Sequence, residues 1–491
     1  MIKTEHNTVQ YHKIILTVVF VILACLILFP RLSSHPLFEW DESRLAVNAY
    51  EMSKSNNPIV TTFESSPDTW NTKPPLLIWV QALFIKVLSP TEWVLRLPSC
   101  IAFLVMCFSL MYMGKTSQDF YMGLFSSLVC LSTPSLFAFH CFRSGDYESF
   151  LLMFYVLYLY SFFLYTETDK RKYLTLFFVF LSLCSLTKGI QAFIPLPILI
   201  VYLAYRKRLL KDIKNKNIYI GIVVCVFVLA LYYIAREIAN PGFFKKVLYN
   251  EVSGRYLSAL EGHKEDYGFY FRLLYESRFV FWLILLPIAL VSNLFIPNQR
   301  RKNITVFFSL TSLFYLVVIT FAQTKLEWYL FPVLPMFAII IGTFLANIYT
   351  FCLQNTKRYI SIPILLLIAF MFVEPYKQVT DIVFHEKSYR NDERYYSNTY
   401  LMRDIAKNKI NIKDIVFLNE EKRQDMVFYY EVICSKKDNN SSFVSFSDLK
   451  EGMNVMISSW EKKEMLQQNF SLEELYSKND VQILRINKKL Q

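Results

Sequence analysis

Four ionisable residues lie close together in the stretch HPLFEWDESRLAVNAYEMSK, which follows the first long apolar run of the chain. Asp41, Glu42, Arg44 and Glu51 fall within one short segment that has a helical pattern. A carboxylate beside cationic side chains stays ionised and can take a proton from a hydroxyl group. Asp41 is therefore a candidate general base. The alternative is that Asp41 only caps the helix, a role that suits aspartate.

Basic residues elsewhere in the chain could bind an anion near this base. Phosphate is the anion natural to a lipid boundary, and fixed cations stabilise a phosphate leaving group most in the transition state. Some lysines, such as Lys86 and Lys245, are better explained as reaching toward lipid headgroups. The candidate phosphate-binding residues are Lys73, Arg143, Lys188, Arg255, Lys325 and Arg44.

Composition indicates the kind of element that must position these residues. The chain has 491 residues, of which 54% are hydrophobic and 19% charged. Runs such as IILTVVFVILACLILF are long enough to cross a ~30 Å hydrocarbon core at ~1.5 Å per residue. The sequence therefore predicts an α-helical polytopic membrane protein. Its net charge of +12 does not predict a nucleic-acid partner, because the basic residues lie between the apolar runs and set topology there.

Short basic loops mark the cytoplasmic side of a membrane protein, and 169–172, 206–216, 298–302 and 356–358 are the clearest here. This charge pattern predicts about eleven spans, within a range of about eleven to thirteen, with a cytoplasmic N-terminus. The expected spans are 14–30, 93–114, 119–139, 148–166, 172–188, 190–205, 218–236, 278–297, 303–322, 328–349 and 359–375.

The apolar stretch 74–88 is left out of this set. It is short, and it begins with Pro74 and Pro75, which suit the first turn of a helix. It is expected to lie in the outer interface, and a twelfth span is the alternative.

The remaining polar segments are then expected outside the cytoplasm. The transmembrane domain would be 1–375, with outer loops 31–92 and 237–277. Residues 376–491 alternate strand-like pieces such as DIVFLN with helical ones such as EKKEMLQQ. That alternation predicts a small soluble α/β domain outside the cytoplasm.

Five motifs in chain order resemble one family. They are WDESRLAVNAYEM, NTKPPLLIWVQALF with EWVLRLPS, FRSGDYESFL, LTKGIQAFIPL and TKLEWYLFPVLP. Together they resemble the GT-C membrane glycosyltransferases, and in particular the aminoarabinose transferases of lipid A and the dolichyl-phosphate-mannose protein mannosyltransferases. The resemblance implies transfer of a sugar from a polyprenyl-phosphate donor to an acceptor hydroxyl, with inversion. The acceptor would be lipid A, another glycan or a protein, and the enzyme would act at the outer face of a bacterial inner membrane.

The resemblance also assigns roles to positions of this chain. Asp41 would be the base and Asp146 a second active-site acid, with Glu42 beside the base. Lys73 and Arg143 would face the donor phosphate, and Lys188 and Lys325 would line the site. The segment LYNEVSGRYL would close over the lipid, with Glu251 and Arg255 at matching positions, and Trp328 and Tyr329 belong to the TKLEWYLFPVLP motif.

Two departures from the family concern a metal. Thr72 stands where the aminoarabinose enzymes have Glu, and Val252 where they have His. The resemblance therefore implies that their zinc site is missing here; a divalent metal remains an open alternative, and no metal ligand is assigned. Two other functions remain open: a transporter or flippase of lipid-linked sugars, and a non-catalytic protein that binds them. A transporter would show charges within spans and repeat symmetry, and neither is visible.

Overall fold

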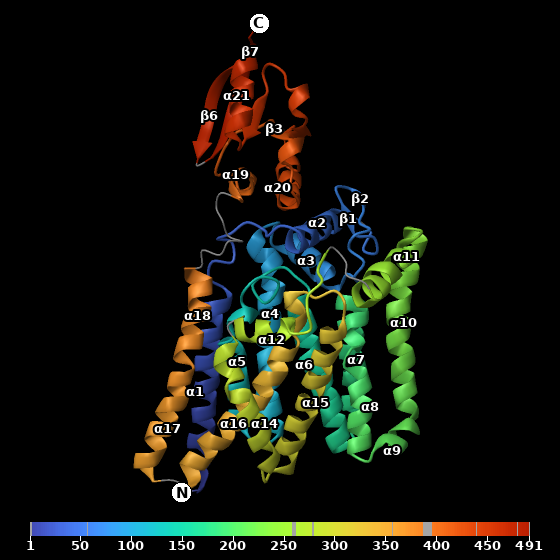
Figure 1. Ribbon diagram of the computed structural model, residues 1–491, viewed down its shortest axis with the longest axis vertical. Helices are drawn as coiled ribbons and strands as arrows, with labels where there is room; N and C mark the ends of the chain where they lie inside the picture. The colour runs from blue at the N-terminus through green and yellow to red at the C-terminus, as the bar shows by residue number, and fades with distance from the viewer. Residues whose placement is uncertain are drawn as a thin grey trace. The chain divides into compact units, whose positions relative to one another are not determined.

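The chain divides into two compact units in the computed structural model (Figure 1). The first consists of Met1–Pro30, Thr69–Leu77 and Arg96–His385, and the second of Arg31–Asp68, Ile78–Leu95 and Glu386–Gln491. The second unit thus joins most of the first predicted outer loop to the C-terminal residues. The division into a membrane domain 1–375 and a soluble domain 376–491 stays a prediction. The structure describes residues 2–55, 57–257, 262–276, 279–355, 357–385, 395–437, 439–478 and 480–490.

The first unit is helical, and its long helices run alongside one another (Figure 1). Helices α5 and α16 pack so closely that a Cβ on Gly342 would lie 2.5 Å from the backbone nitrogen of Ser126, so only glycine fits there. The helices of this unit are α1 (Ile2–Leu28), α4 (Glu92–Thr116, in the main), α5 (Phe120–Leu131), α6 (Glu148–Thr168), α7 (Arg171–Lys188), α8 (Leu196–Tyr205), α9 (Leu209–Ile213), α10 (Lys216–Ala239), α11 (Phe243–Val247), the π-helical η3 (Leu248–Leu257), α12 (Phe269–Glu276), α13 (Val280–Leu283), α14 (Leu285–Ser292), α15 (Gln299–Phe321), the short η5 (Glu327–Leu330), α16 (Val333–Asn355), α17 (Arg358–Met371) and α18 (Val373–Phe384).

Eight helical stretches of the described residues are long and apolar enough to cross a membrane, or nine if a pair bent by 107° counts as one span. Two expected spans, 119–139 and 190–205, contain only the shorter helices α5 and α8, of 12 and 10 residues. Proline ends or shifts the helix in each, at Pro134 and Pro195. Each of the eleven expected spans therefore contains helix in the described residues, but these two helices are shorter than expected, because apolar run length includes irregular residues.

The stretch 74–88 forms α3 (Leu76–Val87), a 12-residue helix. At ~1.5 Å per residue it is about 18 Å long, which is too short to cross the ~30 Å hydrocarbon core.

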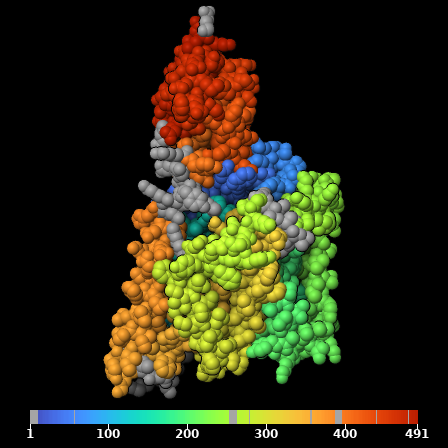
Figure 2. Space-filling model, in the orientation of Figure 1, coloured from blue at the N-terminus to red at the C-terminus, as the bar shows by residue number. Residues whose placement is uncertain are grey.

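Exposed apolar side chains cover the long helices of the first unit. On α10, which is green in Figure 2, Val223 is 65% exposed and Phe227 63% exposed. A continuous apolar surface of this kind is unfavourable in water and favourable against lipid. The protein is an integral membrane protein, as the composition predicted.

The second unit contains two helices and a short β-hairpin from the first predicted outer loop, and an α/β fold formed by the C-terminal residues. Its five-stranded sheet has the order β4-β3-β5-β7-β6, in which β3 is parallel to β4 and β5, and β7 is antiparallel to β5 and β6. A small sheet region near the C-terminus is thus confirmed. The elements are α2 (Asp41–Lys54), β1 (Thr62–Phe63), β2 (Ser66–Pro67), α3 in the main, α19 (Ser397–Ala406), β3 (Ile415–Leu418), α20 (Gln424–Cys434), β4 (Ser442–Val444), β5 (Asn454–Ile457), α21 (Trp460–Asn469), β6 (Phe470–Lys478) and β7 (Val481–Lys489).

Helix α2 packs against α20, two elements that are far apart in the sequence. The rings of Tyr50 and Phe428 meet edge to face at 5.7 Å in this contact. Nearby, burial of Glu431 on α20, together with the hydrogen bond and charge of Glu51 on α2, raises the pKa of Glu431 to about 9. Lys54 opposes this shift and Glu64 adds to it. Glu431 is therefore protonated at neutral pH.

The Glu431 proton predicts a pH dependence of stability. The folded-state pKa of about 9 lies above the ordinary value of 4.5, so the folded state binds the extra proton between these values. The free energy of unfolding should then fall as pH rises through this window, by at most about 1.4 kcal/mol per pH unit. Glu431→Gln should flatten the dependence of the thermal unfolding midpoint on pH, whereas Glu464→Gln on α21 should leave it unchanged. An unchanged slope in Glu431→Gln would show that the proton lies elsewhere.

Candidate active site

Asp41 is the first residue of α2. The N-cap position is occupied by Trp40, which has a φ of 73° and makes no side-chain capping bond. The alternative in which Asp41 serves as the helix cap is therefore wrong. An acidic residue in the first turn is still favoured by the helix dipole. Asp41 thus lies in the first turn of α2, and its role as general base stays a prediction.

The two charged neighbours of Asp41 on α2 have local partners. Glu42 is buried, and its Oε2 accepts a hydrogen bond from Phe38 N at 2.9 Å. Arg44 forms a two-pronged ion pair with the buried Asp68, at 2.9 Å from Nε and 2.8 Å from Nη2. Both contacts stabilise the loop, so these side chains hold the start of α2 in shape.

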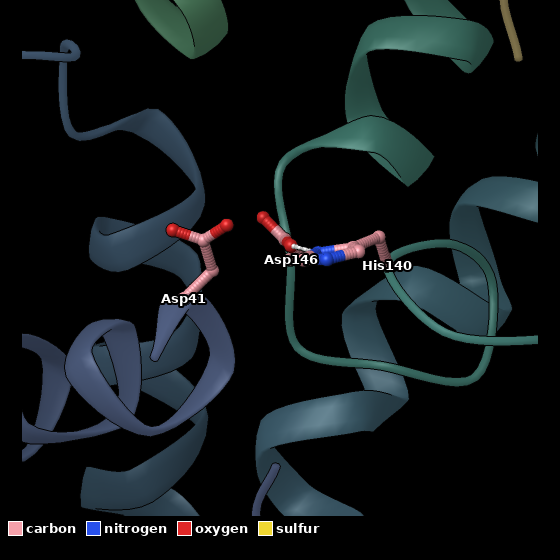
Figure 3. Close-up of side chains that lie close together, drawn as sticks. All are labelled: Asp41, His140 and Asp146. Carbon is pink, nitrogen blue, oxygen red and sulfur yellow. Dashed lines mark hydrogen bonds and ion pairs between the residues drawn. The ribbon is translucent and has the colours of Figure 1, made fainter. Parts of the chain in front are cut away.

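His140 and Asp146 form a buried pair in the loop between α5 and α6. The imidazole Nδ1 of His140 points at the carboxylate of Asp146 and is hydrogen bonded to it (Figure 3). Asp146 also accepts from Tyr147 N at 2.6 Å. Burial alone would raise the pKa of Asp146, but the hydrogen bond and charge of His140 and the charge of Lys188 outweigh it and lower that pKa. Asp146 is therefore held as a carboxylate.

Aromatic side chains surround the His140 ring. Trp328, in η5, lies with its ring centre 3.8 Å from that of His140, and the ring of Phe139 is equally close. Trp328 was predicted as a site residue, whereas His140 was not, although it stands in the same turn as Asp146. A histidine six residues before a candidate acid was the signal that could have identified it.

A second buried pair joins α6 to α7. Lys188 is 4% exposed and forms an ion pair with Glu148, which is 1% exposed. The Lys188 ammonium also lies 5.8 Å from the ring centre of Tyr329. Sequence reasoning placed Lys188 and Tyr329 at the site but missed Glu148. The structure therefore brings four predicted residues of the first unit together with two that were not predicted, and they are Asp146, Lys188, Trp328, Tyr329, His140 and Glu148.

Lys73 is a half-buried cation with aromatic neighbours. Its Nζ lies 5.8 Å from the ring centre of Trp70 and 5.4 Å from that of Tyr147. The Tyr147 hydroxyl is in turn hydrogen bonded to the buried Asn71. Within the described part of the chain Lys73 has no carboxylate partner. Its charge can therefore bind an anion without first breaking an ion pair.

Lys325 has a similar environment at the end of α15. Its Nζ donates to the carbonyl oxygen of Ala322 at 2.8 Å and lies 5.5 Å from the ring centre of Tyr267. Burial lowers the pKa of Lys325. No carboxylate among the described residues forms an ion pair with it. An incoming anion would favour its charged form.

Arg143 binds the end of a helix. Its Nη1 donates to the carbonyls of Ile27 at 2.6 Å and Leu28 at 2.7 Å, and its Nη2 donates to that of Pro30 at 2.8 Å. A cation at the C-terminus of α1 satisfies carbonyls that the helix leaves open. The predicted contact of Arg143 with a donor phosphate stays a prediction.

Thr72 and Glu251 connect the start of the 69–77 segment to η3. The Thr72 hydroxyl donates to Glu251 Oε1 at 2.6 Å. Zinc sites in proteins use histidine nitrogen, cysteine sulfur and carboxylate oxygen as ligands. This pair offers one carboxylate, that of Glu251, which already accepts a hydrogen bond from a hydroxyl. The Thr72–Glu251 pair therefore does not supply such a site. The side chains of Val252 and Arg255 lie outside the described residues.

Comparisons with known proteins find one matching family model and several solved structures of similar fold. Residues 72–234 match the sequence model of the family described as dolichyl-phosphate-mannose-protein mannosyltransferase. The crystal structure of ArnT from Cupriavidus metallidurans bound to undecaprenyl phosphate is similar over 95% of this chain and 97% of that one, with a TM-score of 0.70 and 17% identity. The chain has the GT-C glycosyltransferase fold. The resemblance predicted from the five motifs is thereby confirmed.

A second solved structure with this GT-C fold is more distant. The archaeal oligosaccharyltransferase AglB from Archaeoglobus fulgidus, in complex with an inhibitory peptide and a dolichol-phosphate, covers 86% of this chain. The match covers 64% of AglB, with 12% identity and a TM-score of 0.57. Another structure of the Archaeoglobus fulgidus enzyme is a complex with Zn and sulfate, with a TM-score of 0.51. No curated protein sequence matches the chain significantly.

Proposed function

We propose that this protein is an inverting glycosyltransferase that moves a sugar from a polyprenyl-phosphate donor to an acceptor hydroxyl. The acceptor is lipid A, another glycan or a protein. The reaction takes place at the outer face of a bacterial inner membrane, with the N-terminus in the cytoplasm and the site and C-terminal residues outside it. Neighbours with the same fold were solved with undecaprenyl phosphate and with dolichol-phosphate, which supports a lipid-linked phosphate as one substrate.

The chemistry requires a base and a stabilised leaving group. The acceptor oxygen attacks the anomeric carbon of the sugar while its proton passes to Asp41. The bond from that carbon to the phosphate oxygen breaks, and the polyprenyl phosphate leaves with the bonding electrons. Attack opposite the leaving group inverts the anomeric configuration. Asp146, held ionised by His140, is proposed as a second site acid that orients the substrates.

The single observation that carries the proposal is that two predicted cations form no ion pair with a carboxylate within the described part of the chain. Lys73 lies beside two aromatic rings, and Lys325 lies beside one aromatic ring and one backbone carbonyl oxygen. Fixed positive charge of this kind stabilises the negative charge that grows on a departing phosphate. Arg44 and Lys188 already neutralise Asp68 and Glu148, so we assign them to supporting these contacts.

Lys73→Met tests this assignment without knowledge of the sugar. A hydrogen bond to a charged group contributes about 1.5–3 kcal/mol, so the substitution should weaken binding of undecaprenyl phosphate about 10–100-fold. Binding would be measured by titrating the purified protein in detergent with the lipid phosphate. The matched control is Lys86→Met on α3, whose lysine is exposed and should not matter. Equal loss in both variants would indicate general electrostatics, and no loss in either would remove Lys73 from the phosphate site.

A further inference from the structure

The residues just before Asp41 are held by tyrosines from the C-terminal part of the second unit. The backbone nitrogen of Leu37 donates to the Tyr429 hydroxyl at 2.9 Å, and that of Glu39 donates to the Tyr396 hydroxyl at 3.3 Å. These two amides flank Phe38, whose own N–H donates to Glu42 Oε2 in the first turn of α2. The chain that leads into α2 is therefore pinned at consecutive positions.

Tyr429 is itself fixed by a buried carboxylate. Its hydroxyl donates to Glu92 Oε1 at 2.9 Å, while Lys407 Nζ donates to Glu92 Oε2 at 2.7 Å. Glu92 is fully buried and Tyr429 is 2% exposed. Hydrogen bonds to a charged group in a site that excludes water are among the stronger ones. Lys407, just after α19, thus fixes Glu92 at the start of α4. Glu92 in turn holds the Tyr429 hydroxyl, to which the Leu37 amide is bonded.

The conformation that these bonds hold is a strained one. Trp40 has a φ of 73°, a region that side-chain-bearing residues rarely adopt. Such strain persists only where the surroundings determine the backbone firmly. Trp40 comes directly before Asp41, so a looser anchor at Leu37 would allow the backbone to relax and the Asp41 carboxylate to turn.

We propose that Tyr429 is a positioning residue for Asp41: its hydroxyl joins the amide of Leu37 to the buried Glu92 and so fixes the loop that presents the base. The C-terminal residues then act as a scaffold of the reaction. The proposal rests on the proposed function, because it needs Asp41 to be the base. The hydroxyl is the operative group, since the ring alone could not bond to Leu37 and Glu92.

Tyr429→Phe tests this with two measurements on the full-length protein in detergent. Steady-state transfer, with the polyprenyl-phosphate sugar that the parent accepts, should show a kcat lower by about tenfold or more with an unchanged KM for the donor, because a misplaced base slows chemistry but not binding. Hydrogen–deuterium exchange should become faster at residues 37–39. This second measurement needs no substrate.

Tyr430→Phe is the matched control, since it removes a hydroxyl from the neighbouring residue of α20. The Tyr430 ring packs 4.7 Å from Phe443 of the sheet, away from the loop. It should change neither kcat nor exchange at 37–39. Unchanged exchange in Tyr429→Phe, or faster exchange with normal kcat, would overturn the proposal. No transfer by the parent would overturn the proposed function and the catalytic role of Tyr429 together, while the exchange data would still decide whether Tyr429 holds the loop.

Discussion

Asp41→Asn is expected to reduce sugar transfer by a factor of about 100 or more while the protein stays folded in detergent. Asparagine has nearly the same shape as aspartate but cannot accept the acceptor proton. The measurement is transfer of radiolabelled sugar from polyprenyl-phosphate donors extracted from membranes. The size of the loss reflects removal of general-base catalysis.

The structure makes this test sharper than the sequence did. Because Trp40 occupies the N-cap position, a change at Asp41 does not remove a helix cap. The loss of activity can therefore be attributed to chemistry once thermal unfolding of the variant matches that of the parent. Glu64→Gln is the matched control, since Glu64 is an exposed loop acid paired with Lys422. Equal transfer by Asp41→Asn and the parent would move the base to Asp146.

Lys188→Met is expected to destabilise the first unit strongly. Methionine fills much of the space of lysine but leaves Glu148 as a buried carboxylate without its cation. Removing one partner of a buried ion pair costs about 3–5 kcal/mol. The measurement is the thermal unfolding midpoint of the purified protein in detergent, which should fall well below that of the parent.

The double variant Lys188→Met with Glu148→Gln separates charge from packing. Removing both charges should restore much of the lost stability, because a neutral pair no longer leaves an uncompensated ion in the core. Its transfer activity should still be low if the pair also orders Tyr329 and Asp146. A double variant as unstable as Lys188→Met would show that the lysine stabilises the fold by shape alone.

The membrane part of the fold could be predicted because apolar length is a local property. Runs such as 148–166 correspond closely to α6, and strand-like pieces such as DIVFLN correspond to β3. Helix length was overestimated where proline broke an apolar run, as before α8. Composition averages over such breaks, so it overestimates the length of continuous helix.

The candidate site was harder to predict because its partners are distant in sequence. Lys188 was selected as a cation, but Glu148 lies 40 residues earlier, at the start of a span, and gave no sign of the pairing. Likewise, Arg44 was assigned to phosphate because Asp68 could not be placed beside it. A sequence shows which charges exist, whereas three-dimensional packing decides which of them are already neutralised.

The bond between Leu37 and Tyr429 has a consequence for biosynthesis. The two residues are 392 positions apart, so at about 5–20 residues per second the ribosome needs roughly 20–80 s to supply the second after the first. During that interval the loop that bears Asp41 lacks its anchor. If Tyr429 positions Asp41 as proposed, nascent chains and chains truncated before Tyr429 should therefore be inert.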